Sequence, residues 1–127
     1  VRCTISVETE INQLVDSLDM LEAERERILA SVLASPERRI VITHGTDTMT
    51  RTAELLDGRG AGRGRTVVLT GAMVPFTVSG SDALFNLGGA IVAAQTLDSG
   101  VWIAMHGRLF RAGRVAKDRE RGEFRAT

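Results

Sequence analysis

This chain has no tyrosine, one cysteine and one lysine. With Cys3 alone, neither an intrachain disulfide nor a cysteine-based zinc site can form. We therefore expect a reduced, cytoplasmic setting. No apolar run approaches the ~18 residues that a membrane-spanning helix needs. The absences thus exclude a disulfide-stapled scaffold and give no reason to expect a membrane partner.

Neither sign of charge dominates the composition. Sixteen Lys plus Arg balance sixteen Asp plus Glu, so the formal net charge is zero. Nucleic-acid-binding domains are usually strongly basic, which argues against that class of partner. The 127 residues suit one domain that can bury a core without staples. Because Val1 is not followed by an apolar signal-peptide segment and is not an initiator methionine, we expect the chain to begin inside a longer protein.

Strand and helix patterns alternate along the chain. Three short apolar runs without alternation are typical of strands buried on both faces of a parallel sheet: 38–44, 66–70 and 101–105. Helical periodicity is found in three further segments: 19–34, 48–56 and 81–97. The order predicts an α/β fold, a three-layer, doubly wound and mostly parallel sheet. The glycine-rich segment 58–64 follows a helix and precedes a strand, the reverse of a dinucleotide-binding loop, so we interpret it as a surface connection.

The first helix has a broad apolar stripe. We expect Asp19 to be its N-cap, with Glu22 completing a capping box. Leu21 and Leu33 belong to the expected buried face, together with three residues between them: Ile28, Leu29 and Val32. Arg25 is expected among the charged side chains of the opposite, solvated face.

In doubly wound sheets, ligands bind outside the carboxyl ends of the strands. Three loops leave those ends here: 44–47, 71–73 and 106–108. In the first loop, the Thr46 hydroxyl can be a nucleophile only if a base takes its proton. Asp47 can cap the following helix or bind a substrate ammonium, and the local sequence leaves both interpretations open.

Lys117 is the one lysine among sixteen basic residues. A desolvated lysine beside a hydroxyl is an effective proton acceptor, whereas arginine stays protonated and cannot replace it. Yet Lys117 lies in a polar stretch, 114–121, of the kind that is usually exposed to solvent. From local context, a catalytic base and a solvated side chain both remain possible.

Four blocks, in order, resemble the bacterial-type L-asparaginase family and extend over nearly the whole chain: Ile42–Met49, Leu69–Pro75, Ser81–Leu87 and Ile103–Lys117. The resemblance implies a flavodoxin/Rossmann-like N-terminal domain over residues 1–127 that lacks its first strand and nucleophile loop. It also implies an amidohydrolase that converts L-asparagine to L-aspartate and ammonia, without a cofactor or metal.

The resemblance also implies a role for each matching residue. Thr46, Lys117 and Asp47 would form the family's threonine–lysine–aspartate group, with Lys117 as proton acceptor and Asp47 binding the substrate α-amino group. The backbone carbonyl of Ala72 would help fix the side-chain amide, and Ser17 would bind the α-carboxylate. The attacking threonine of the family belongs to a Gly-Gly-Thr-Ile strand that would lie upstream of Val1.

The two histidines are expected to play smaller parts. His44 should form hydrogen bonds within the turn that follows its strand, because the Lys–Thr pair leaves it no role as a base. His106 lies in a loop that varies within the family, and we expect no catalytic role for it.

Two alternatives remain beside the asparaginase. One is a catalytically inactive amino-acid-binding module, suggested by the missing nucleophile and by Leu18, which stands beside Ser17 where the family commonly has a polar residue. The other is a glutaminase or amidotransferase-type relative that acts on glutamine or on a larger amide. On family grounds, and because an incomplete sheet exposes apolar surface, we expect a homodimer or homotetramer.

Overall fold

The computed structural model describes residues 3–10, 12 and 17–127. A short 3₁₀ helix, η1, covers Ser17–Asp19, and three α-helices follow: α1 (Glu22–Ala34), α2 (Met49–Gly58) and α3 (Ala83–Thr96). The strands are β1 (Arg39–Thr43), β2 (Thr66–Thr70), β3 (Gly100–Met105), β4 (Arg108–Arg111), β5 (Val115–Asp118) and β6 (Glu123–Ala126). Helices and strands alternate as predicted up to β3.

Four strands form one mixed sheet in the order β1-β2-β3-β4. β1, β2 and β3 are parallel, with Ile40 opposite Val67 and Val67 opposite Val101. β4 runs antiparallel to β3 and pairs Phe110 with Ile103. The predicted α/β fold is confirmed, whereas β4 was not anticipated, because its polar sequence RLFR resembles a loop.

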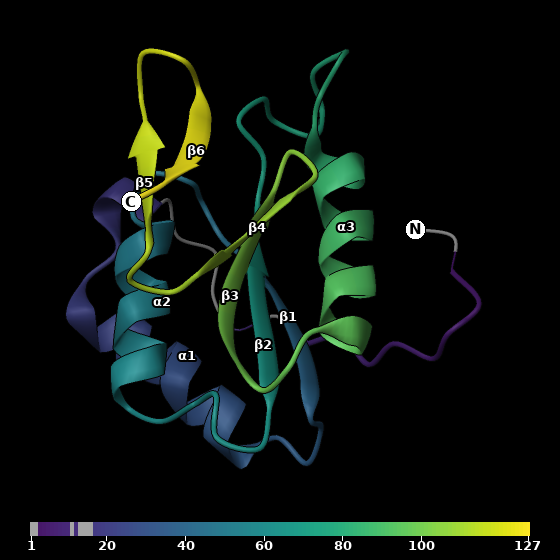
Figure 1. Ribbon diagram of the computed structural model, residues 1–127, viewed down its shortest axis with the longest axis vertical. Coiled ribbons are helices and arrows are strands. Elements are labelled where there is room, and N and C mark those ends of the chain that lie inside the picture. The colour runs from purple at the N-terminus through teal and green to yellow at the C-terminus, as the bar shows by residue number, and fades with distance from the viewer. Residues whose placement is uncertain (1–2, 11, 13–16) are drawn as a thin grey trace.

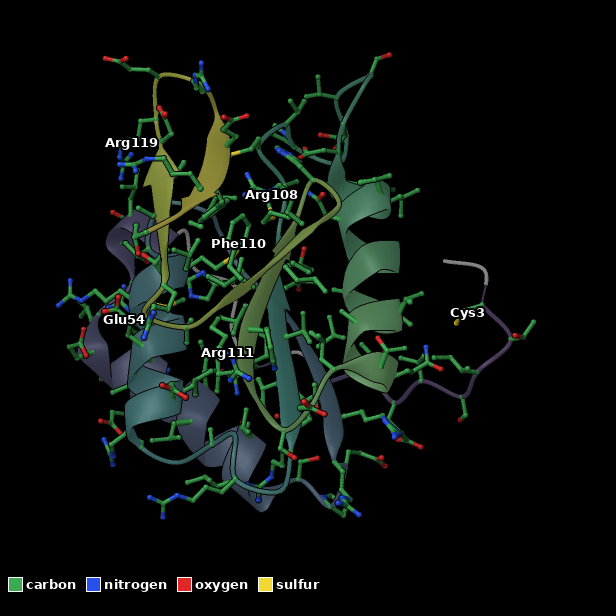
Figure 2. All side chains as sticks on the ribbon, viewed as in Figure 1. Cys3, Glu54, Arg108, Phe110, Arg111 and Arg119 are labelled. Atoms are coloured by element: carbon green, nitrogen blue, oxygen red, sulfur yellow. The ribbon has the colours of Figure 1, made fainter. Side chains whose placement is uncertain are left out.

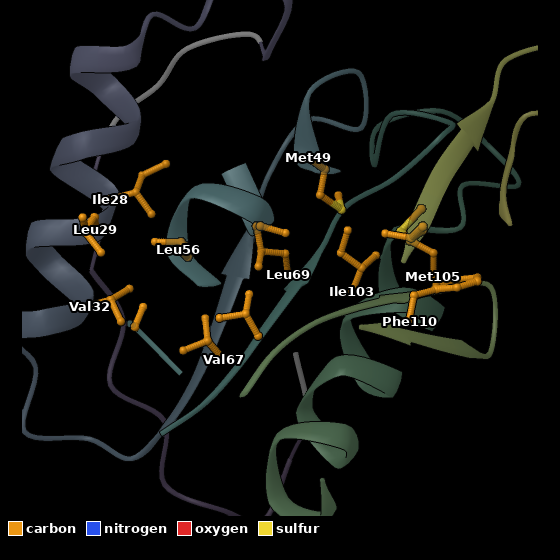
Figure 3. Packing of buried hydrophobic residues seen from close by; sticks show 14 of the residues in the cluster. Ile28, Leu29, Val32, Met49, Leu56, Val67, Leu69, Ile103, Met105 and Phe110 are labelled. Carbon is orange, nitrogen blue, oxygen red and sulfur yellow. The ribbon is translucent and has the colours of Figure 1, made fainter. Parts of the chain in front are cut away.

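Helices cover both faces of the sheet, α3 on one side and α1 with α2 on the other (Figure 1). Every residue of β2 is buried, and successive side chains point to opposite faces. Val67 and Leu69 join the core cluster of α1 and α2, shown in Figure 3, while Val68 packs with the alanines of α3. The central strand therefore belongs to two cores, which explains its unbroken apolar sequence.

Helix α1 differs from the prediction at its start and on its buried face. It begins at Glu22 rather than at Asp19, which belongs to η1, and the Glu24 carboxylate accepts the backbone N–H of Leu21. The buried residues repeat at helical spacing: Arg25, Ile28, Leu29 and Val32. Arg25 is therefore inside, 1% exposed, whereas Leu21 and Leu33 are exposed.

Helix α3 packs through small residues. Its buried positions are Asn86, Ala90, Ala93 and Ala94. Several of the larger apolar side chains face outward instead: Leu84, Phe85 and Val92 are all more than half exposed. The small residues bring the helix backbone close to the sheet, and the exposed side chains leave an apolar outer surface.

The polar C-terminal stretch forms a hairpin of β5 and β6 rather than a loose tail. Val115 and Phe124 anchor the hairpin, because both are buried in the core cluster on the α2 side. Figure 1 shows the hairpin standing beyond the end of α2. Among the described residues, no helix is long and apolar enough to cross a membrane.

Candidate functional site

The turn between β1 and α2 carries the first two candidate side chains. Thr46 is 8% exposed, and α2 begins three residues later at Met49, which is fully buried. Thr48 occupies the N-cap position of α2. Asp47 is half-buried, and its carboxylate contacts two cations rather than the N-terminus of the helix, so its interpretation as a helix cap is not supported.

Lys117 reaches this turn from strand β5. Its Nζ atom donates to Thr46 Oγ1 at 2.9 Å and to Asp47 Oδ1 at 2.8 Å. The Lys117 side chain is 16% exposed, so it is largely withdrawn from solvent. The structure thus brings together the three residues that the resemblance assigned to one group.

A second cation contacts the same carboxylate. The Arg119 guanidinium donates to Asp47 Oδ1 at 2.8 Å, although its side chain is 64% exposed (Figure 2). The hydrogen bond from Lys117 is the main cause that lowers the pKa of Asp47; burial opposes it, and the charges of Lys117 and Arg119 add to the lowering. Asp47 is therefore an anion at neutral pH, as a group that binds an ammonium must be. No motif in the sequence indicated a role for Arg119.

The loop after β2 lies against the turn that follows β1. A Cβ atom on Gly71 would lie 2.1 Å from the backbone oxygen of His44, so this close approach requires glycine. The backbone N–H of His44 in turn donates to Thr70 O at 2.8 Å. Ala72, whose carbonyl is the expected contact of a substrate amide, is half-buried in the same loop.

Asp82 and Asn86 hold this loop in place. The Asp82 carboxylate accepts the backbone N–H groups of Met73 and Val74, each at 3.0 Å, and the Asn86 amide at 2.9 Å. Asn86 also donates to Gly71 O at 2.8 Å. Both residues fall within a block that resembles the asparaginase family, but the sequence analysis assigned neither a role. No sequence signal marked either residue, because only the folded helix shows that Asn86 lies on its buried side.

His106 completes this cluster. Its Nε2 atom lies 2.7 Å from Asp82 Oδ2, and its backbone N–H donates to Asn86 Oδ1 at 2.9 Å. Burial raises the pKa of Asp82, but the N–H groups of Met73 and Val74 and the His106 imidazole together outweigh it, leaving that pKa well below its usual range. These contacts of His106 are structural, and that it has no catalytic role stays a prediction.

His44 forms hydrogen bonds at the strand end, as expected. Nδ1 lies 2.7 Å from Gly45 O, and Nε2 lies 2.8 Å from Thr52 Oγ1. Burial is the main cause that lowers its pKa; the bond to Gly45 raises it, and the charge of Arg25 lowers it. The net pKa is below its ordinary value of 6.5, so the imidazole is neutral at pH 7.

Ser17 begins η1, but its side chain and residues 13–16 lie outside what the structure describes, so its predicted contact with a substrate carboxylate stays a prediction.

In the described part of the chain, no group of three or more His, Cys, Asp or Glu side chains is placed to hold a metal ion. Two surface hollows lie at the amino ends of the strands, lined by residues such as Arg39, Thr66 and Gly100. Thr46 lies at the opposite edge of the sheet, beyond the carboxyl ends of the strands, where ligands bind in sheets of this kind. We therefore place the candidate site there and not in the hollows.

The fold and the site together define a class of protein. It is a doubly wound α/β domain in which a threonine, an aspartate and a lysine meet beyond the carboxyl ends of the strands. Comparison with family models then assigns the chain to a family: it belongs to the asparaginase family, whose N-terminal domain model matches residues 2–123.

Known relatives agree with this assignment. L-asparaginase 1 of Escherichia coli strain K12 is 34% identical over 111 residues, which cover 85% of this chain and 33% of the relative. The 60 kDa lysophospholipase of Homo sapiens is 36% identical over 111 residues, which cover 85% of this chain and 19% of the relative. The crystal structure of L-asparaginase I from Vibrio cholerae superposes with a TM-score of 0.80 at 30% identity, covering 93% of this chain and 37% of that one. This chain thus spans about a third of the Escherichia coli relative.

Proposed function

We propose that the full-length protein is an amidohydrolase that converts L-asparagine to L-aspartate and ammonia. The observation that carries the proposal is the contact of Lys117 with both Thr46 and Asp47, at 2.9 and 2.8 Å. Membership of the asparaginase family supports the reaction class, and several matched relatives are named L-asparaginases.

Each side chain has a distinct task in this proposal. Asp47, an anion, binds the α-ammonium of the substrate. The Ala72 carbonyl accepts a hydrogen bond from the side-chain amide, and Ser17 donates to the α-carboxylate. These contacts orient a zwitterionic amino acid so that its amide lies near Thr46.

Lys117 and Thr46 transfer the proton. A substrate ammonium bound to Asp47 adds a further positive charge near Lys117, beside that of Arg119, which favours loss of the lysine proton. The neutral amine then takes the proton of the attacking hydroxyl or water, by way of Thr46, as the nucleophile adds to the amide carbon. When the carbon–nitrogen bond breaks, that proton leaves with the ammonia. Where the nucleophile is a hydroxyl, an ester remains, and a water then adds to its carbonyl carbon. The proton of this water passes by the same route to the departing hydroxyl oxygen, and aspartate is released. We place the first nucleophile, a threonine, upstream of Val1, and Thr46 and Lys117 assist it.

The test is ammonia release by the full-length protein, supplied with asparagine and, separately, with glutamine. We expect Lys117→Met to lower kcat by about 10²-fold or more, because it removes the proton acceptor. Arg121→Met is the matched control: this cation lies on the same hairpin with its side chain 74% exposed, and its loss should leave kcat unchanged. Undiminished turnover in Lys117→Met would contradict the assignment.

Calorimetry with aspartate separates the enzyme from its alternative. Aspartate binding without ammonia release would show an inactive amino-acid-binding module. Release from glutamine in preference to asparagine would show a glutaminase-type relative instead.

We also propose that the protein is a cytoplasmic homodimer or homotetramer. Exposed apolar side chains support the assembly, among them Phe76 and Phe85, each 66% exposed. Cys3 is a free, exposed thiol, which suits a reducing compartment. Sedimentation that finds only monomers at micromolar concentration would contradict the assembly, and recovery outside the cytoplasm on cell fractionation would contradict the location.

A further inference from the structure

Arg25 is a buried cation that the proposed chemistry does not use. Its side chain is 1% exposed, and its guanidinium, which has five N–H donors, makes four hydrogen bonds. Nε donates to Thr52 Oγ1 at 3.2 Å, and one terminal nitrogen donates to Thr48 Oγ1 at 2.9 Å. The other terminal nitrogen donates to Met20 O at 3.1 Å and to Glu22 Oε1 at 3.0 Å.

The hydrogen bonds that continue from Thr52 have a single direction. The Gly45 carbonyl can only accept, so His44 Nδ1 must carry the proton of the 2.7 Å bond between them. In the neutral ring, Nε2 is then an acceptor, and the Thr52 hydroxyl must donate to it at 2.8 Å. The Thr52 oxygen in turn accepts from Arg25. The order is therefore Arg25 to Thr52, Thr52 to His44, and His44 to the Gly45 carbonyl.

We propose that Arg25 is a positioning residue of the candidate site, which it orders through this directed chain of hydrogen bonds. The Gly45 carbonyl belongs to the peptide bond that leads into Thr46, so fixing its direction fixes the backbone from which the Thr46 hydroxyl projects. The role of Thr46 rests on the proposed function; the chain of hydrogen bonds does not.

The same guanidinium connects a second part of the site. Met20, whose carbonyl it binds, directly follows η1, the segment that contains Ser17. One side chain thus holds both the turn of Thr46 and the end of the segment expected to bind the substrate carboxylate. Lysine cannot replace it, because a guanidinium presents its donors in a rigid planar fork and an ammonium does not.

The experiment uses the full-length protein and removes the central hydroxyl. Thr52→Val should displace the ¹⁵N resonance of His44 Nε2 and the backbone amide resonance of Thr46, and should lower kcat by about 10- to 100-fold. KM should change less, because Asp47 is held independently by Lys117 and Arg119. Thr52→Ser, which keeps the hydroxyl, should restore the resonances and most of kcat. Thr52→Ala replaces the valine variant if circular dichroism shows that the latter does not fold.

Two controls separate positioning from general damage to the fold. Thr50→Val changes a half-buried threonine of the same helix that is outside this chain of hydrogen bonds. Arg27→Lys changes an exposed arginine of α1 and is matched to Arg25→Lys. Both controls should behave as wild type, whereas Arg25→Lys should reproduce the loss of kcat seen in Thr52→Val.

The outcomes are distinct. An unchanged kcat in Thr52→Val, with the His44 resonance displaced, would overturn the positioning role. If even the wild-type protein releases no ammonia, the proposed function fails, and the Thr46 amide resonance decides the positioning role instead. Its displacement in Thr52→Val and return in Thr52→Ser support that role, while no displacement overturns it.

Discussion

The Nζ atom of Lys117 lies 2.9 Å from Oγ1 of Thr46, although 71 positions separate the two residues in the sequence. The contact exists because β5 and β6 pair into a hairpin whose buried residues, Val115 and Phe124, join the core beside α2. The site therefore depends on the docking of a hairpin as much as on the order of its residues.

Replacing Lys117 by arginine separates charge from proton transfer. Lys117→Arg keeps a cation beside Asp47, but the guanidinium does not give up its proton at neutral pH. We expect kcat for ammonia release to fall by about 10²-fold or more, as far as in the methionine variant. Retention of more than half of the wild-type kcat would show that the lysine contributes charge alone.

The affinity for aspartate should change by different amounts when Asp47 or Arg119, the two members of one ion pair, is replaced. Asp47→Asn should weaken aspartate binding by about 10-fold or more, because a charge-assisted hydrogen bond to the ammonium is lost. Arg119→Gln should change the affinity by less than about threefold, since exposed ion pairs contribute little. Calorimetric titration with aspartate measures both, and equal losses in the two variants would contradict these assignments.

The Asp82 carboxylate should make stability depend on pH. Because its pKa is lowered in the folded state, its contribution is fully present above its ordinary pKa of 3.8 and is lost as the pH falls below that value. Asp82→Asn should cost about 1–3 kcal/mol at pH 7, a loss that stays constant down to about pH 4 and then shrinks.

Urea unfolding at a series of pH values tests this prediction. Asp57→Asn, at an exposed position near the end of α2, is the matched control and should leave the free energy of unfolding nearly unchanged. A loss in Asp82→Asn that is the same at pH 3 and pH 7 would rule out the carboxylate charge as its cause.

Two glycines should respond in opposite directions to an added methyl group. Gly71→Ala should destabilise the fold by about 1–3 kcal/mol, because the new Cβ would meet the His44 carbonyl and the two strand-end loops would have to separate. Gly88→Ala, in the exposed middle of α3 with open space around it, should stabilise by about 0.5–1 kcal/mol. Unfolding midpoints measure both, and an unchanged midpoint in Gly71→Ala would mean that the loops are not in close contact.

Much of the fold was predictable because its pattern is local. The three parallel strands were expected from short β-branched runs without alternation, and each was found within one residue of the predicted bounds. The strands β4, β5 and β6 were not recognised, since RLFR, VAKD and EFRA carry too few apolar residues to stand out from a polar loop. These segments are strands because each forms hydrogen bonds to a neighbouring strand, and that pairing depends on the tertiary structure.

Which face of each helix is buried was harder to infer than the presence of the helix. Arg25 has the same spacing as Ile28, Leu29 and Val32, but its charge assigned it to the solvated face. It can be buried only because Thr48, Thr52 and Met20 O lie in reach of its donors. Helix α3 shows the reverse case: alanines face the sheet while Leu84 and Phe85 are exposed, because close packing there selects for size as well as polarity.

Residue type and spacing are properties of the chain, so three features could be inferred before folding: the alternation of strands and helices, the strand-end position of Thr46 and Asp47, and the singular character of Lys117. Three others depend on the fold. Lys117 is largely withdrawn from solvent, Arg119 shares Asp47 with it, and Arg25 is connected to the turn before Thr46 through Thr52 and His44. These relationships join residues far apart in the sequence, and a hydrogen bond requires its two atoms to lie about 3 Å apart, which only the folded chain achieves.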